Sequence, residues 1–225
     1  MKYLVELILL MLACSIEAGI QEAEERTPSG AVVSENCFQY EYLGNAKERC
    51  TYVNVDSTKP VLLVGDSRTV GFYLSTKCDR FAYVAKGCMG YSWLVDGTDC
   101  YNPTDLITYY IEANPNGIII FNLGVNDLAN KEKYAKWVEN FMTQYPGTNL
   151  YYMAVNPVRG RDDLDIVGFN SYMQSNIPES VKWLDSFSYL EEVGFSAGDG
   201  VHYDNKTYIK LLELIDATVG EFDYE

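Results

Sequence analysis

The sequence has little histidine, few basic residues and no repeats, and each shortage excludes a kind of site, partner or domain organisation. It has one histidine, His202, and its six cysteines form no C-x-x-C pair, which disfavours a metal site. Lysine and arginine total 17 against 32 acidic residues, a net charge of −15, which disfavours binding to nucleic acid and to anionic membranes. No internal repeat or low-complexity segment divides the 225 residues, and 48% of them are hydrophobic. One well-filled domain is therefore expected.

The N-terminal apolar stretch is too short for a comfortable membrane span. Residues 1–19 place one lysine and an apolar run before small residues, which is the layout of a secretory signal peptide, although Glu6 interrupts the run. Cleavage after Ala18 and lipidation of Cys14, in a box that loosely resembles that of bacterial lipoproteins, are both open. Lipidation would tether the protein to a membrane. We expect a secreted or cell-surface protein; the alternative is a buried N-terminal helix.

The cysteines suit an exported protein whose thiols oxidise. Cys37 and Cys50 flank a short segment and would close a loop worth roughly 2–3 kcal/mol if the geometry permits. Cys78, Cys88 and Cys100 are the others outside the leader, so one thiol is odd. The pairing among these five stays open.

Beyond the leader, the composition separates a linker from a folded domain. Residues 20–36 are acidic, small and without aromatics, which is typical of a linker, and a domain at 37–225 follows, with an N-terminal extension at 37–59. Within the domain, apolar runs alternate with helical patterns. Strands are expected at 61–64, 81–85, 117–124, 149–155 and 181–185, and helices near 68–77, 103–113, 131–145, 166–176 and 205–219.

This alternation predicts an α/β fold, a three-layer α/β/α sandwich with a parallel, flavodoxin-like sheet, because the expected strands are apolar throughout. In such sheets a site lies outside the carboxyl ends of the strands. The residues that could carry chemistry should therefore follow strands directly.

Ser67 does so, in VLLVGDSRT at 61–69. Its hydroxyl is either a nucleophile or only the start of the next helix. His202 lies in AGDGVHYDN, three residues after Asp199. A lone histidine is more often structural, but this spacing lets the carboxylate accept the Nδ1–H and leaves Nε2 to take a proton from a serine.

Two further segments offer groups that could bind an oxyanion. Asn126, in NLGVNDL at 122–128, either presents its amide to a developing negative charge or forms a turn that caps the next helix. In AKGCMGYSW at 85–93, Gly87 or Gly90 can bring a backbone N–H close to a carbonyl.

In chain order these segments are GDS, a glycine loop, GVND and DGVH. They resemble the four blocks of the SGNH hydrolases, also called the GDSL esterase/lipase family, over about residues 60–220. The resemblance implies that Ser67 is the nucleophile, His202 the general base and Asp199 its orienting acid. It also implies an oxyanion hole made of the Ser67 and Gly90 N–H groups and the Asn126 amide.

Other positions of these blocks have different expected roles. Gly90 is preferred to Gly87 because Gly-Tyr-Ser matches the family's Gly, any residue, then Ser or Thr. Arg68 stands where the family name has leucine, at a variable position. Asp66 and Asp127 are expected to hold their loops.

The resemblance implies a serine esterase that needs no metal or organic cofactor. Tyr91 and Trp93 follow the proposed oxyanion glycine and would stack a sugar ring, which favours an O-acetyl ester of carbohydrate, although both rings are equally well explained as core. Arg68 would bind an acidic sugar or, alternatively, form a salt bridge. An acyltransferase and a non-catalytic glycan-binding module are the competing function classes.

Two motifs compete with these assignments. GFSAG at 194–198 matches the G-x-S-x-G elbow of α/β-hydrolases, but Gly198 and Gly200 would break the helix that must follow Ser196. Asn205, in NKT at 205–207, matches a glycosylation acceptor and is interpreted instead as the N-cap of the last helix.

Overall fold

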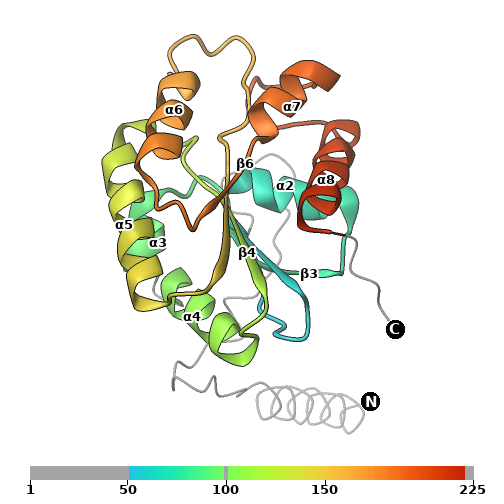
Figure 1. Cartoon of the computed structure of the whole chain (residues 1–225). Helices are drawn as coiled ribbons and strands as arrows, with labels where there is room; N and C mark the ends of the chain where they lie inside the picture. The colour runs from blue at the N-terminus through green and yellow to red at the C-terminus, as the bar shows by residue number, and fades with distance from the viewer. Residues whose placement is uncertain (1–50, 99–100, 221–225) are drawn as a thin grey trace, which may run out of the picture.

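Strands made almost entirely of buried residues form the centre of the fold. The computed structural model describes residues 51–98 and 101–220, and its sheet lies between two layers of helices (Figure 1). Every residue of β2 and β4 is buried. The six strands are β1 (Thr51–Asn54), β2 (Val61–Gly65), β3 (Phe81–Lys86), β4 (Ile118–Asn122), β5 (Asn149–Met153) and β6 (Lys182–Leu184).

The strand order is β1-β3-β2-β4-β5-β6. The five strands β2 to β6 pair with one another only in the parallel direction, in the order β3-β2-β4-β5-β6. This is the flavodoxin-like order, which confirms the predicted fold class. The sheet is not parallel throughout, however, because β1 pairs with β3 in the antiparallel direction. This strand lies in the expected N-terminal extension and only one of its residues, Val53, is buried, so a search for continuous apolar runs missed it.

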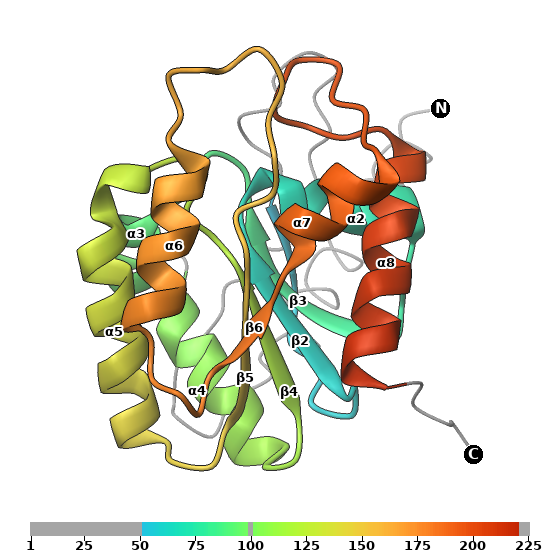
Figure 2. The same ribbon diagram turned by 45° about the horizontal axis from the view of Figure 1, so that its top comes forward.

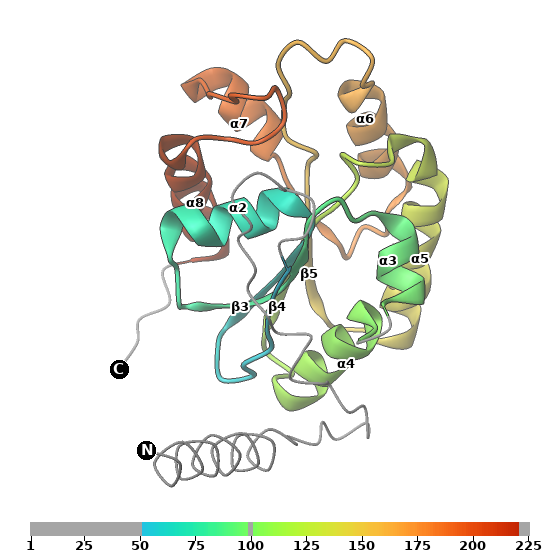
Figure 3. The same cartoon turned by 180° about the vertical axis from the view of Figure 1, so that it is seen from behind.

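Helices cover both faces of the sheet (Figure 2). One layer holds α2 (Ser67–Thr76), α7 (Ser186–Val193) and α8 (Asn205–Val219). The other holds α3 (Tyr91–Asp96), α4 (Pro103–Ala113), α5 (Lys131–Gln144) and α6 (Ile166–Asn176), and the view from behind shows the same two groups (Figure 3). The five expected helices are confirmed. The sequence missed α3 and α7, which are too short to repeat a helical period convincingly.

The alternation of side chains along each strand divides the core in two. Leu62 and Val64 point to the layer with α4 and α5, whereas Val61 and Leu63 point to the layer with α2 and α8. Strands buried on both faces cannot alternate polar with apolar residues, which explains the continuous apolar runs.

Several expectations concern residues outside the described part of the chain. These are the leader, the linker, Cys37, Cys50 and Cys100. Within the described part, Cys78 is a buried free thiol. No helix among residues 51–98 and 101–220 has the length and hydropathy to cross a membrane.

The N-cap of α8 is Asp204, not Asn205 as predicted. The Asp204 carboxylate accepts the Thr207 backbone N–H at 2.8 Å, while Asn205 accepts a hydrogen bond from the Ser75 hydroxyl. An aspartate one position earlier reaches the free N–H groups of the first turn equally well. The hydrogen bonds from the backbone and side chain of Thr207 lower the pKa of Asp204 below its ordinary value of 3.8.

We predict that Asp204→Ala lowers the free energy of unfolding by about 1 kcal/mol, whereas Asn205→Ala changes it by less than about 0.5 kcal/mol. Because the pKa of Asp204 is lower in the folded state, the contribution of its charge is present above pH 4 and is lost as the pH falls. Urea unfolding of both variants at pH 7 and pH 3.5 measures this. An equal loss in the two variants would contradict the assignment.

Candidate active site

The residues singled out in the sequence converge at one edge of the sheet. Ser67 begins α2 directly after β2, Gly90 follows β3, and Asn126 follows β4. Asp199 and His202 lie in the loop between α7 and α8. The carboxyl ends of the parallel strands therefore meet at the expected site.

Three side chains form a continuous hydrogen-bonded chain. His202 Nε2 lies 2.8 Å from Ser67 Oγ, and His202 Nδ1 lies 2.8 Å from Asp199 Oδ2. A carboxylate only accepts hydrogen bonds, so Nδ1 carries the proton and Nε2 is left to accept from the serine hydroxyl. This is the geometry of a nucleophile, a general base and an orienting acid.

The loop itself fixes the orientation of Asp199. The other carboxylate oxygen accepts the backbone N–H groups of His202 at 2.7 Å and of Val201 at 3.1 Å. The acid is thus bound to both the ring and the backbone of the histidine. Its side chain cannot rotate without breaking these contacts, so the imidazole is held toward Ser67.

Asp66 decides between the two interpretations of Ser67. Asp66 is the N-cap of α2, and its Oδ1 accepts the Arg68 backbone N–H at 2.9 Å. The cap is therefore already provided, and the serine hydroxyl is left to contact His202.

Burial raises the pKa of Asp66 to about 6, against the opposing effect of Arg68. The ionised form of Asp66 therefore lowers the free energy of unfolding above pH 6. This loss disappears as the pH falls from 6 toward 4, because the carboxyl group is then protonated in the folded protein.

Asn126 joins the loops that carry the expected oxyanion donors. Its Nδ2 donates to the Met89 carbonyl at 2.8 Å and lies 3.4 Å from Asp66 Oδ2. The residue before Gly90 and the residue before Ser67 are thereby held next to the same amide. The longer of the two contacts is weak, so one amide hydrogen is available to an oxyanion. The alternative turn is present at Gly124–Asp127, directly before the 3-10 helix η3 (Leu128–Asn130), but its Asp127 makes no capping hydrogen bond and the Asn126 amide contacts Met89 and Asp66 instead.

Asp127 holds the Gly90 loop, as expected. Its Oδ2 accepts the Tyr91 backbone N–H at 2.7 Å, and its Oδ1 accepts the Tyr134 hydroxyl at 2.8 Å. A Cβ atom at position 90 would overlap the Asp127 carboxylate, so only glycine fits there. Gly87 lies in the turn directly after β3. The structure thus gives Gly90, not Gly87, the close approach to the Asn126–Asp127 segment.

Solved structures of known proteins share this fold. A lipase/acylhydrolase from Enterococcus faecalis matches with a TM-score of 0.51 and 13% identity, over 72% of this chain and 95% of its own. An SGNH hydrolase structure from Slackia heliotrinireducens gives 0.53 and 15%, over 72% and 99%. The catalytic domain of the Streptococcus pneumoniae peptidoglycan O-acetyltransferase OatA gives 0.51 and 16%, over 72% and 92%.

The chain has the SGNH hydrolase fold. No family model matches it, and no curated protein matches its sequence. Of the four blocks, which follow one another in the order that the resemblance implies, three lie directly after β2, β3 and β4, and the fourth lies in the loop between α7 and α8.

Arg68 does not face a substrate, so its expected binding role is wrong. The side chain is 1% exposed, and its guanidinium donates to the carbonyls of Val201 at 3.1 Å and Asn156 at 2.9 Å. It also lies over the ring of Tyr203. Among the residues that the structure describes, Arg68 does not form the alternative salt bridge either, because its N–H groups donate to backbone carbonyls.

Trp93 is also not a substrate-stacking residue. Its side chain is 3% exposed and packs in the core beside α4, so the core interpretation holds for this ring. Tyr91 is half-buried and meets Tyr134 edge-on, with ring centroids 5.4 Å apart. Of the two aromatic residues after Gly90, Tyr91 alone retains a partly exposed ring.

Ser196 lacks the elbow geometry, as the sequence indicated. It lies in an irregular segment between α7 and an isolated bridge, with no strand before it. Its backbone N–H donates to the Thr207 hydroxyl. No sequence pattern indicates the other residues that support the site, since Asn156, Pro157 and Val201 act through backbone carbonyls.

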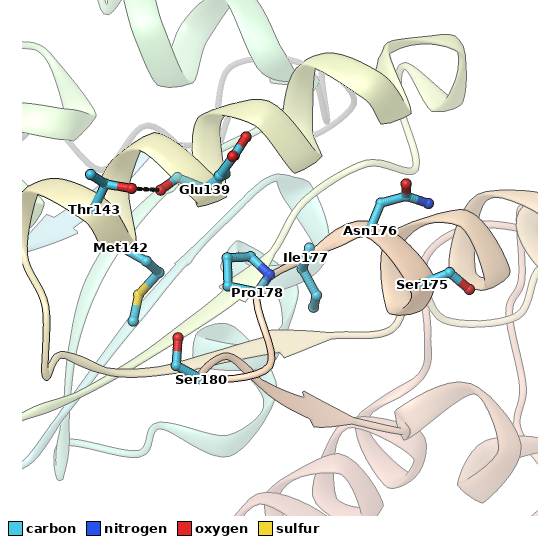
Figure 4. Close-up of a pocket in the computed structure, with 8 residues that line it drawn as sticks. All are labelled: Glu139, Met142, Thr143, Ser175, Asn176, Ile177, Pro178 and Ser180. Carbon is cyan, nitrogen blue, oxygen red and sulfur yellow. Dashed lines mark hydrogen bonds between the residues drawn. The ribbon is translucent and has the colours of Figure 1, made fainter.

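A groove lies away from Ser67, Asp199 and His202. A groove of about 470 Å³ is formed at the C-terminal ends of α5 and α6 (Figure 4), lined by Glu139, Met142, Thr143, Ser175, Asn176, Ile177, Pro178 and Ser180. Both helices start at the carboxyl edge of the sheet, so these ends lie at the opposite edge. In residues 51–98 and 101–220, no cluster of three or more His, Cys, Asp or Glu is placed to hold a metal ion.

We predict that Gly90→Ala displaces the Asp127 carboxylate and lowers esterase kcat by about 10²-fold or more, which is the effect of losing one oxyanion donor. Gly198→Ala is the matched control, because a Cβ there meets nothing within 4 Å. Hydrolysis of 4-nitrophenyl acetate and thermal unfolding are measured for both. Full activity in Gly90→Ala would contradict the assigned oxyanion hole.

Proposed function

We propose that this protein is a secreted serine esterase that hydrolyses carboxylic esters through an acyl-enzyme on Ser67, with O-acetyl groups on carbohydrate as its natural substrates. The observation that carries the proposal is the continuous contact from Asp199 through His202 to Ser67, with both side-chain distances at 2.8 Å. The likeness to lipase and acylhydrolase structures agrees with this chemistry.

In the first half-reaction, His202 Nε2 takes the Ser67 proton while Oγ attacks the ester carbonyl. The carbonyl electron pair moves to oxygen, and the N–H groups of Ser67 and Gly90 with the Asn126 amide stabilise it. The first N–H groups of a helix have no partner within the helix, which suits Ser67 to this role. The imidazolium then protonates the departing alcohol, and the acyl group stays on Ser67.

In the second half-reaction, water replaces the alcohol. His202 removes a proton from the water, the hydroxide oxygen bonds to the acyl carbon, and the tetrahedral intermediate returns the electron pair to expel Ser67 Oγ. The imidazolium gives Oγ its proton back. Asp199 stabilises the imidazolium in both halves and stays ionised.

Two features support carbohydrate esters as substrates. The half-buried Tyr91 ring lies one residue from Gly90 and suits stacking against a sugar. The N-terminal residues have the layout of an export signal, with cleavage or lipidation of Cys14 as its two routes, so extracellular polysaccharide would be within reach.

Acyl transfer to a sugar hydroxyl is the second candidate function. One structure with the same fold is the catalytic domain of a peptidoglycan O-acetyltransferase. The chemistry up to the acyl-enzyme is the same, and only the acceptor differs. A glycan-binding module without catalysis is less well supported, because it would not need a histidine aligned with a serine.

We predict that the domain from residue 30 onward hydrolyses 4-nitrophenyl acetate, and that Ser67→Ala lowers kcat at least about 10³-fold because no other group replaces the nucleophile. Nitrophenol release measures this. Ser196→Ala is the matched control and should keep wild-type activity. Loss of activity only in Ser196→Ala would reverse the assignment of the nucleophile.

We further predict that free acetate remains the main product when an oligosaccharide acceptor is added to the wild-type enzyme with an acetyl donor. Mass spectrometry of the acceptor and enzymatic determination of acetate give the two yields. Acetylated acceptor in excess of free acetate would make the protein an acetyltransferase instead.

A further inference from the structure

A cationic side chain lies over the ring of Tyr91, the residue that follows Gly90. Lys133 Nζ lies 5.7 Å from the centroid of the Tyr91 ring, and Tyr91 directly follows Gly90. The Tyr91 backbone N–H is fixed by Asp127, the neighbour of Asn126. Lys133 is exposed, so its ammonium group is presented to solvent beside Tyr91.

Lys133 has no acidic partner in the described part of the chain. Its neighbours one helical turn away, Ala129, Asn130, Lys136 and Trp137, include no carboxylate, and no ion pair with it is formed there. Lys136, one turn further along α5, does pair with Glu139 at 2.8 Å. The ammonium group of Lys133 is thus available to a ligand.

The position of this charge is unfavourable for the helix. Lys133 is the third residue of α5, and Lys131 is the first. The N-terminus of a helix carries partial positive charge, so cations in its first turn cost stability. Glu132 lies between the two lysines and offsets part of this charge, but Lys133 itself gains nothing from the helix terminus and forms no ion pair in the described part of the chain.

We infer, on the basis of the proposed function, that Lys133 and Tyr91 form a subsite for a carboxylate-bearing sugar, and that the esters cleaved are those of an acidic carbohydrate. The ring of Tyr91 packs against the sugar ring and the ammonium group pairs with its carboxylate. This subsite takes the role that the sequence suggested for the buried Arg68. It also gives an anionic substrate a local attraction that the acidic surface as a whole does not provide.

Binding to the Ser67→Ala protein tests this without turnover. The probes are trigalacturonate and the same trisaccharide with its carboxyl groups reduced to alcohols, titrated by calorimetry. Trigalacturonate should bind more tightly, and Lys133→Gln should weaken its binding two- to five-fold while leaving the neutral probe unchanged. The difference should shrink between 0.02 and 0.3 M salt because the contact is exposed.

Lys136→Gln is the matched control, since it removes the same charge from the same helix and should not alter binding. Lys133→Gln should also unfold at the same temperature as its parent or higher, because it relieves the helix terminus. Equal binding of the two probes, binding of neither, or equal weakening by Lys133→Gln and Lys136→Gln would overturn the inference. Hydrolysis of 4-nitrophenyl acetate by the wild type tests the proposed function separately: activity there without discrimination between the probes overturns the subsite alone.

Discussion

The buried guanidinium of Arg68 holds the site together. It sits in the first turn of α2, one residue after Ser67, and donates to carbonyls of the loop after β5 and to Val201 in the loop of His202. Two loops that are distant in sequence are thereby connected to the residue next to Ser67. A guanidinium suits this task because its N–H groups diverge in a plane and remain protonated in the interior. Val201 directly precedes His202, so the hydrogen bond from Arg68 also positions the loop in which His202 contacts Ser67 at 2.8 Å.

Carboxylates organise the remaining loops. Asp66 caps α2 and lies next to the Asn126 amide, and Asp127 receives the backbone N–H of Tyr91. Burial raises the pKa of Asp66 to about 6, so its ionised form is held at a cost in stability. This is the usual balance at a functional site, where charges are arranged for chemistry and the large apolar core on both faces of the sheet compensates.

The cationic side chains around the site form two groups: one stabilises the fold, and the other is exposed to ligands. Arg68, next to Ser67, is buried and stabilises the fold, whereas Lys131 and Lys133 at the start of α5 lie over the partly exposed rings of Tyr172 and Tyr91. Arg68 is not available to a substrate, because backbone carbonyls accept the hydrogen bonds of its guanidinium. Lys133 is available, because it is exposed and has no acidic partner in the described part of the chain.

The sequence by itself determined the five parallel strands, most of the helices, and the candidate residues Ser67, Asp199 and His202, because these depend on local patterns: apolar runs, helical periodicity and short polar motifs. It missed β1, α3 and α7, whose signals are short or half-polar, and it placed the α8 cap one residue late. Only the tertiary structure decided which cations and rings reach solvent. The burial of Arg68 and Trp93 comes from loops and helices folded over them, and no neighbour in sequence reports that. The choice of Gly90 was likewise settled by Asp127, which lies 37 positions further along the chain and fills the space that a Cβ would need.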